Sequence, residues 1–85
     1  MADENRFEEL VLPHLDAAHN LARWLTRNPA DAEDVVQDAC MRALKYIDAL
    51  QGNGARAWFL TIVRHARLAR ARAMLQRSPL LHVVN

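Results

Sequence analysis

One cysteine, two glycines and no acidic residue after Asp48 are the clearest shortages in this sequence of 85 residues. A single cysteine, Cys40, excludes an internal disulfide and favours a reducing compartment. The start MADENRFEEL is too acidic for a signal peptide, and no apolar run approaches the roughly 18 residues of a membrane span. These shortages predict a cytoplasmic chain with one domain at most.

The usual patterns of catalysis and metal binding are also missing. His14 and His19 do not have the i, i+4 spacing of a zinc-protease pair on one helix face. The loop QGNG at residues 51–54 has no lysine and is too short to hold a phosphate group. We therefore expect neither enzyme activity, nor a cofactor, nor a metal site.

Acids and bases are divided unevenly along the chain. Residues 1–50 hold five bases and ten acids, a net charge of −5, whereas residues 51–85 hold six arginines and no acid. Such a division indicates two surfaces with different partners, of which the basic one suits a polyanion. The alternative is a dipolar chain whose charges only keep it soluble.

Apolar periodicity predicts three helical segments and no strand. The first covers about 5–27, with a kink or break near Leu12 because Pro13 removes a backbone donor. The second, about 28–49, begins with a capping asparagine followed by a proline, and the third covers about 55–76.

These segments predict an all-α fold, a small antiparallel bundle of three to four helices in residues 1–77, followed by a tail at 78–85. Trp24 and Trp58 occupy apolar helical positions, so we expect both in the core and not as stacking platforms for bases. The expected inward positions are Ala32, Val36, Ala39, Ala43, Ile47 and Leu50 in the second helix, and Trp58, Phe59, Ile62, Ala66, Ala69 and Ala73 in the third.

A polar stripe follows the opposite side of the second helix. Asp34, Asp38, Met41 and Lys45 recur at steps of four, three and four, with Gln37 beside Asp34. Acids with a flexible methionine among them suit a docking surface for another helix, because the acids steer the partner and the methionine adapts to it. The alternative is a solvated face with one stray apolar residue.

Three segments of the chain, in order, resemble region two of bacterial RNA polymerase sigma factors, most closely those of the extracytoplasmic-function class. They are FEELVLPHLDAAHNLARWLT, NPADAEDVVQDACMRALKYIDAL and ARAWFLTIVR, which together cover about residues 7–64. The run D-A-E-D-x-x-Q-[DE], followed by RA, is the specific part. The resemblance implies an all-helical domain that binds the clamp helices of the largest catalytic subunit of RNA polymerase, melts the promoter and recognises the minus-ten element.

By position, the resemblance assigns polymerase binding to the second helix, and DNA binding to the following loop and the third helix. With Lys45 of the spaced stripe included, the polymerase-binding candidates are Asp34, Gln37, Asp38, Met41, Arg42 and Lys45. The DNA-binding candidates are Leu50, Gln51, Asn53, Arg56, Arg64, His65, Arg67 and Arg70. The resemblance also implies an anti-sigma factor as a partner.

The likeness weakens after Arg64. His65 stands where the family usually has asparagine, Leu50 replaces an aromatic residue and Gln51 replaces arginine. A histidine cannot offer the paired donor and acceptor of an amide. An alternative function therefore stays open: a truncated sigma-like chain that docks on polymerase or an anti-sigma partner without sequence-specific promoter recognition.

The family's second helical domain, region four, is absent from these 85 residues. The chain is either an excised domain or a naturally short relative, and a departure that begins inside the third helix favours the second explanation. A further alternative is a homo-oligomer that forms through the apolar tail, at Leu80, Leu81, Val83 and Val84.

Overall fold

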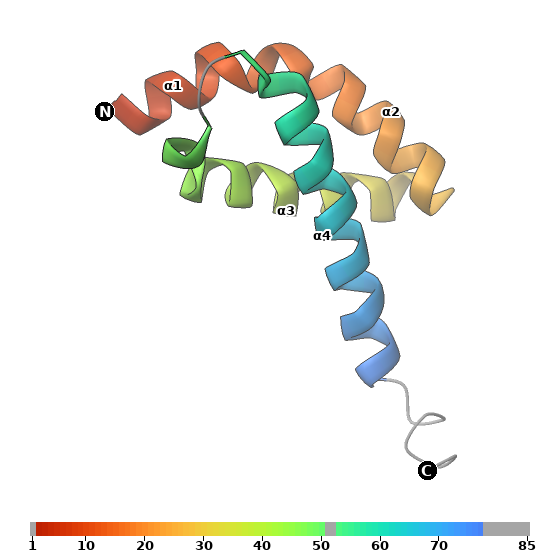
Figure 1. The fold of residues 1–85 in the computed structure, drawn as a ribbon. Coiled ribbons are helices and arrows are strands. Elements are labelled where there is room, and N and C mark those ends of the chain that lie inside the picture. Colours follow the sequence, from red (N-terminus) through yellow and green to blue (C-terminus); the bar gives the residue numbers. More distant parts are fainter. Residues whose placement is uncertain (1, 51–52, 78–85) are drawn as a thin grey trace.

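The computed structural model describes residues 2–50 and 53–77 (Figure 1). Over these ranges the fold is all-α, as predicted, and contains no strand. Gln51 and the tail residues expected to mediate self-association lie outside the described residues. The elements are α1 (Ala2–Leu10), the short 3-10 helix η1 (Leu12–His14), α2 (Leu15–Thr26), α3 (Pro29–Lys45), the 3-10 helix η2 (Ile47–Ala49) and α4 (Ala55–Arg77).

The first predicted helix breaks where Pro13 interrupts it. The backbone N–H of Val11 donates to the carbonyl of Phe7 at 2.8 Å, and that of His14 donates to the carbonyl of Val11 at 2.9 Å. The second of these spans three residues, so the chain passes through the 3-10 helix η1 between α1 and α2. This confirms the predicted break, which forms because Pro13 has no N–H to donate in a continuous α-helix.

A tight reversal joins α2 to α3. Arg27 takes up the left-handed conformation, with φ of 56°, and its N–H donates to the carbonyl of Arg23 at 2.8 Å. Asn28 follows in an extended conformation, and its side-chain oxygen accepts from the N–H groups of Ala30 and Asp31 at 2.9 and 3.1 Å. This confirms the predicted cap, and α3 runs back antiparallel to α2 (Figure 1).

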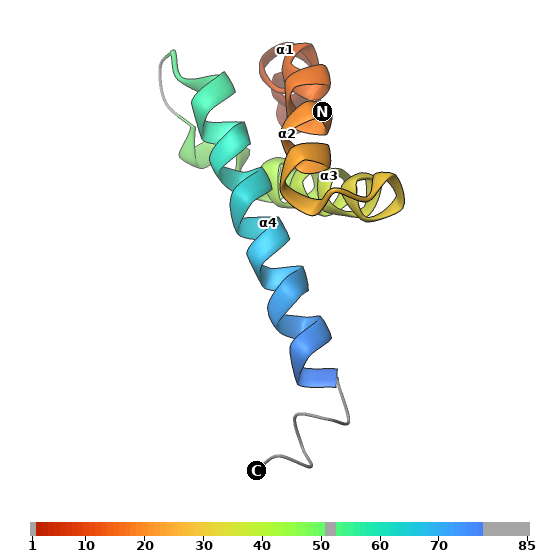
Figure 2. The same cartoon turned by 90° about the vertical axis from the view of Figure 1, so that its right-hand side faces the viewer.

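Helix α4 lies across the antiparallel pair. Figure 2 shows that it passes α3 and continues beyond it, away from the other helices. Its last fully buried residue is Ala66, so residues 67–76 hold only partly buried or exposed side chains. The half of α4 near its N-terminus therefore joins the core, and the other half projects from it.

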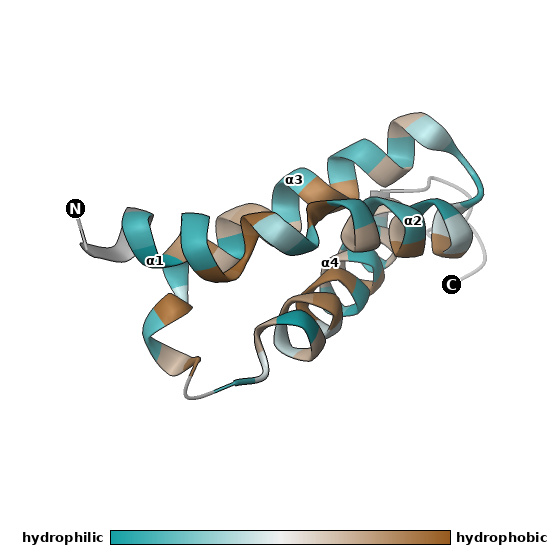
Figure 3. Cartoon of the chain, turned by 90° about the horizontal axis from the view of Figure 1, so that it is seen from above, coloured by the Kyte–Doolittle hydropathy of each residue, from teal (hydrophilic) through white to brown (hydrophobic). Residues whose placement is uncertain are grey.

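The core consists largely of alanine and valine from α2 and α3, packed against larger side chains of α4. Hydrophobic turns of α1, α3 and α4 lie mostly where these helices approach one another (Figure 3). All six inward positions expected for the second helix are buried, whereas Val35 and Val63 are core residues that periodicity missed. The buried residues are Val11, Ala18, Ala22, Ala32, Val35, Val36, Ala39, Ala43, Ile47, Leu50, Phe59, Val63 and Ala66.

The two tryptophans differ in their environment. Trp58 is partly buried and packs against the core, as expected. Trp24 is 73% exposed, so the prediction of a core position for it is wrong. The reason is geometric: Trp24 lies two positions beyond the buried Ala22, which places it roughly 200° around the helix, on the outer side of α2.

Leu50, which follows η2, is the last buried residue before the loop that leads to α4. Its side chain is 4% exposed, and its carbonyl oxygen accepts a hydrogen bond from the Arg6 guanidinium at 3.1 Å. The same guanidinium lies 3.6 Å from a carboxylate oxygen of Asp48. Arg6 thus ties α1 to the segment that leads into the loop. In the part of the chain that the structure describes, no helix is long and apolar enough to cross a membrane.

The cap on α3 generates a stability prediction. Replacing Asn28 with alanine leaves two N–H groups without their partner, so we expect the free energy of unfolding to fall by about 1 kcal/mol. Urea denaturation followed by circular dichroism measures this. Asn20→Ala is the matched control: Asn20 is exposed within α2, where alanine favours helix formation, so stability should not fall. Equal losses in the two variants would contradict the assigned role of the cap.

Candidate functional site

The polar stripe predicted for the second helix lies on the outer side of α3. Together with Arg42, which the resemblance adds, its residues form what we call the α3 ridge: Asp34, Gln37, Asp38, Met41, Arg42 and Lys45. Asp34, Gln37, Met41 and Lys45 are exposed, whereas Asp38 and Arg42 are partly buried. The side opposite the ridge carries the buried alanines and valines of α3. One helix therefore supplies the core on one side and an open polar surface on the other.

Met41 is the conspicuous member of the ridge, because it is 72% exposed. Beside it, the Arg42 Nε donates to an Asp38 carboxylate oxygen at 3.2 Å, one helical turn away. Pairs of this kind contribute only about 0.3–0.5 kcal/mol to stability. The ridge thus presents a charge pair next to an exposed, flexible apolar side chain.

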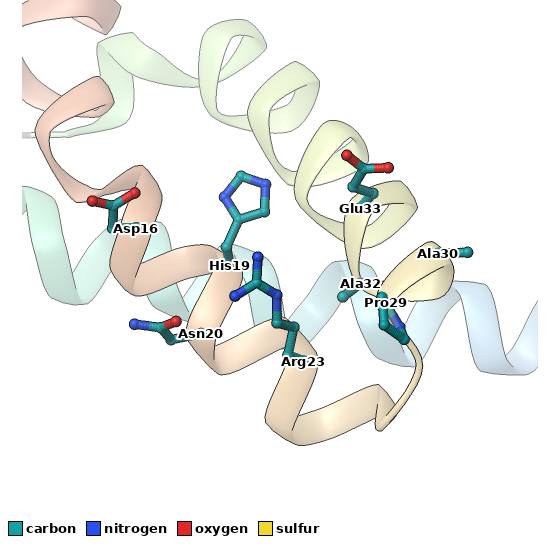
Figure 4. A pocket seen from close by; sticks show the side chains of 8 residues that line it. All are labelled: Asp16, His19, Asn20, Arg23, Pro29, Ala30, Ala32 and Glu33. Carbon is teal, nitrogen blue, oxygen red and sulfur yellow. The ribbon is translucent and has the colours of Figure 1, made fainter.

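A groove runs between α2 and α3 and adjoins the ridge. Its larger part, about 900 Å³, is lined by the side chains that Figure 4 shows, among them Asp16, His19, Arg23 and Glu33. A smaller part of about 440 Å³ shares His19 and Glu33 and reaches Gln37 and Met41 of the ridge. The sequence analysis did not identify this groove, since it depends on how closely α2 and α3 pack.

The groove contains one imidazole, that of His19, and one thiol, that of Cys40. The His19 Nδ1 lies 3.0 Å from the carbonyl oxygen of Leu15. Since a carbonyl only accepts, Nδ1 carries the proton in this contact and Nε2 is left for another partner. Cys40 is partly buried in the smaller part of the groove, and burial raises the pKa of its thiol. Among the described residues, no group of three or more histidine, cysteine, aspartate or glutamate side chains could hold a metal ion.

The DNA-binding candidates do not share one environment. Asn53, Arg56, Arg64 and His65 are exposed, the first in the loop and the others on α4. The buried side chain of Leu50 belongs to the core, so it is not part of an exposed DNA surface. Gln51 lies outside the described residues.

Arg67 and Arg70 differ from the arginines nearer the start of α4, because both contact other helices. The Arg67 Nη2 donates to the carbonyl of Leu25, at the end of α2, at 3.5 Å. The Arg70 Nη2 donates to a carboxylate oxygen of Asp34 on the α3 ridge at 3.3 Å. The structure therefore brings a polymerase-binding candidate into contact with a DNA-binding candidate, which the sequence did not suggest.

The raised pKa of Cys40 generates a prediction about its reactivity. Only the thiolate attacks iodoacetamide, so at pH 8 the folded chain should be alkylated several-fold more slowly than the same chain unfolded in urea. Raising the pH should increase the rate in the folded chain over a higher range than in the unfolded one. Mass spectrometry of timed samples measures both rates. Equal rates at pH 8 would show that burial does not protect this thiol.

Comparison with known proteins identifies the family of this chain. No solved structure matches the chain. The model of the family described as Sigma-70 region 2 matches residues 10–77, which include α2, α3 and the whole of α4. Members of that family act in transcription initiation, where they bind core RNA polymerase and promoter DNA. Because the match covers well over half of its length, this chain belongs to the sigma-70 region 2 family.

Proposed function

We propose that this chain docks on the clamp helices of the largest catalytic subunit of RNA polymerase through the α3 ridge and offers α4 to minus-ten promoter DNA, as a sigma factor of the extracytoplasmic-function class. The observation that carries the proposal is the exposure of the ridge. No other part of the described chain covers Gln37, Met41 or Lys45, and the residues on the opposite side of α3 are committed to the core.

The affinity of docking depends more on Met41 than on any single charge. Burying a methionine side chain contributes about 1.5–3 kcal/mol, whereas a surface ion pair contributes about 0.2–1 kcal/mol. The carboxylates of Asp34 and Asp38 instead raise the rate of association with a basic helix and set its orientation. Gln37, which lies between the two acids, can both donate and accept a hydrogen bond at the interface.

Contact with DNA is assigned to the exposed arginines of α4. The helix contains six arginines and no acid, so it carries a strongly positive potential. Arg56 and Arg64 are exposed and can reach phosphate oxygens without breaking an internal contact that the structure records. His65 is also exposed, so its side chain can donate one hydrogen bond to a base edge.

Docking is tested with two methionine variants. Met41→Ala should weaken binding to the isolated clamp helices about tenfold, equivalent to about 1.4 kcal/mol, because the ridge loses its apolar contact. Met74→Ala is the matched control, since Met74 is 66% exposed on α4, outside the ridge. Isothermal titration calorimetry measures both affinities. The proposal fails if the unmodified chain does not bind the clamp helices at low salt, or if both variants bind like it.

DNA binding is tested by fluorescence anisotropy with single-stranded oligonucleotides that differ in one hexamer. We expect a clear preference for one hexamer. Equal, weak binding to all of them would support the alternative, a sigma-like chain that docks without promoter recognition. The presence of His65, where the resemblance expects asparagine, favours this alternative.

Arg64→Gln should weaken binding to every sequence and reduce the slope of log affinity against log salt by about 0.7. Arg27→Gln, which removes an exposed arginine from the turn after α2, should leave the slope unchanged.

A further inference from the structure

One ion pair joins the two proposed surfaces. Asp34 belongs to the α3 ridge and Arg70 to the basic helix α4, and their charged atoms lie 3.3 Å apart. They are separated by 36 positions in the sequence, so the contact exists only because α4 crosses α3. Each residue therefore has a partner inside the chain and, under the proposed function, another partner outside it.

We propose that the Asp34–Arg70 pair couples polymerase docking to DNA binding. When neither partner is bound, the two side chains hold each other. A cation of the docked partner that takes over the Asp34 carboxylate releases Arg70 for a phosphate group. A phosphate that takes over Arg70 releases Asp34 for docking. This inference rests on the proposed function, because it requires that both surfaces be used.

The pair is suited to such an exchange because it is accessible and singly bonded. The side chains are 52% and 42% exposed, so an incoming charge can reach either of them through solvent. Only one contact between them is recorded, from Nη2 to one carboxylate oxygen, and not the two parallel bonds of a strong arginine–carboxylate fork. A phosphate oxygen or a partner's cation can replace this bond with one of equal or greater strength.

The surroundings of Arg70 keep it near Asp34 and leave space beside it. Arg70 lines an open hollow of about 170 Å³, and Asp31, Val35, Arg67 and Met74 are among the other lining residues. Arg67 is held by the Leu25 carbonyl, whereas Asp31 is a second acid on the same side of α3. Asp31 and Arg67 are thus the other charged groups that line the hollow with Arg70, and the contact with Asp34 keeps the guanidinium near α3 until phosphate competes for it.

The size of the coupling follows from the strength of the pair. Exposed ion pairs of this kind change equilibria by a factor of about two to five. Since coupling between two binding sites is reciprocal, docking should strengthen DNA binding by the same factor by which DNA strengthens docking. We therefore expect modest positive cooperativity that depends on one residue of each surface.

The experiment compares Arg70→Gln with Arg72→Gln in the full chain. Both variants remove one positive charge from exposed positions two residues apart on α4, but of these two arginines only Arg70 has an ion pair among the described residues. Affinity for the isolated clamp helices is measured by calorimetry, without DNA and with a saturating single-stranded oligonucleotide of twelve nucleotides. Circular dichroism verifies that both variants keep their helix content. Arg70→Lys, which keeps the charge, serves as the rescue variant.

Without DNA, Arg70→Gln should dock about twofold to fivefold more tightly than Arg72→Gln, because Asp34 is already released. Adding the oligonucleotide should tighten docking of the unmodified chain, Arg72→Gln and Arg70→Lys by about the same factor, but not that of Arg70→Gln. Equal docking by Arg70→Gln and Arg72→Gln overturns the coupling and leaves the proposed function intact. Absence of docking by the unmodified chain overturns the proposed function, and the coupling with it.

Discussion

The packing of α3 against α2 and α4 is the constraint on which the rest of the molecule depends. The inward side of α3 is almost entirely alanine and valine, so α2 and α4 can approach it closely. The buried positions together fix the rotation of α3 about its own axis. Once that rotation is fixed, Asp34, Gln37 and Met41 must lie on the outward side of the helix. The surface proposed to bind polymerase is thus a consequence of a core built from small residues.

The same packing accounts for the relation between the two charged surfaces. Because α4 crosses α3 and continues beyond it, the C-terminal half of this acid-free helix passes the acidic first turns of α3. Arg67 and Arg70 make contacts there with the end of α2 and with Asp34. The division of charge along the sequence therefore has a structural role within the chain, in addition to its proposed role in attracting two different partners.

Local rules of the sequence predicted the features that depend on neighbouring residues. Pro13 predicted the break between α1 and α2, and Asn28 predicted the start of α3. The spacing from Ala32 to Leu50 predicted the buried side of α3 and of the segment that follows it. Features that depend on the crossing of helices could not be predicted in this way. The groove at His19 and the contact of Asp34 with Arg70 both require knowledge of where α4 and α2 lie relative to α3. The exposure of Trp24, by contrast, follows from its angle to the buried Ala22 on the same helix.

The most direct test of this account is a nuclear magnetic resonance titration of the isotopically labelled chain with unlabelled clamp helices. The account predicts that the largest changes in backbone amide shift fall on the exposed side of α3, from Asp34 to Lys45, with a smaller change at Arg70 when its ion pair opens. Changes concentrated instead on α1, or around the exposed Trp24 at the outer side of α2, with the α3 ridge unaffected, would contradict it.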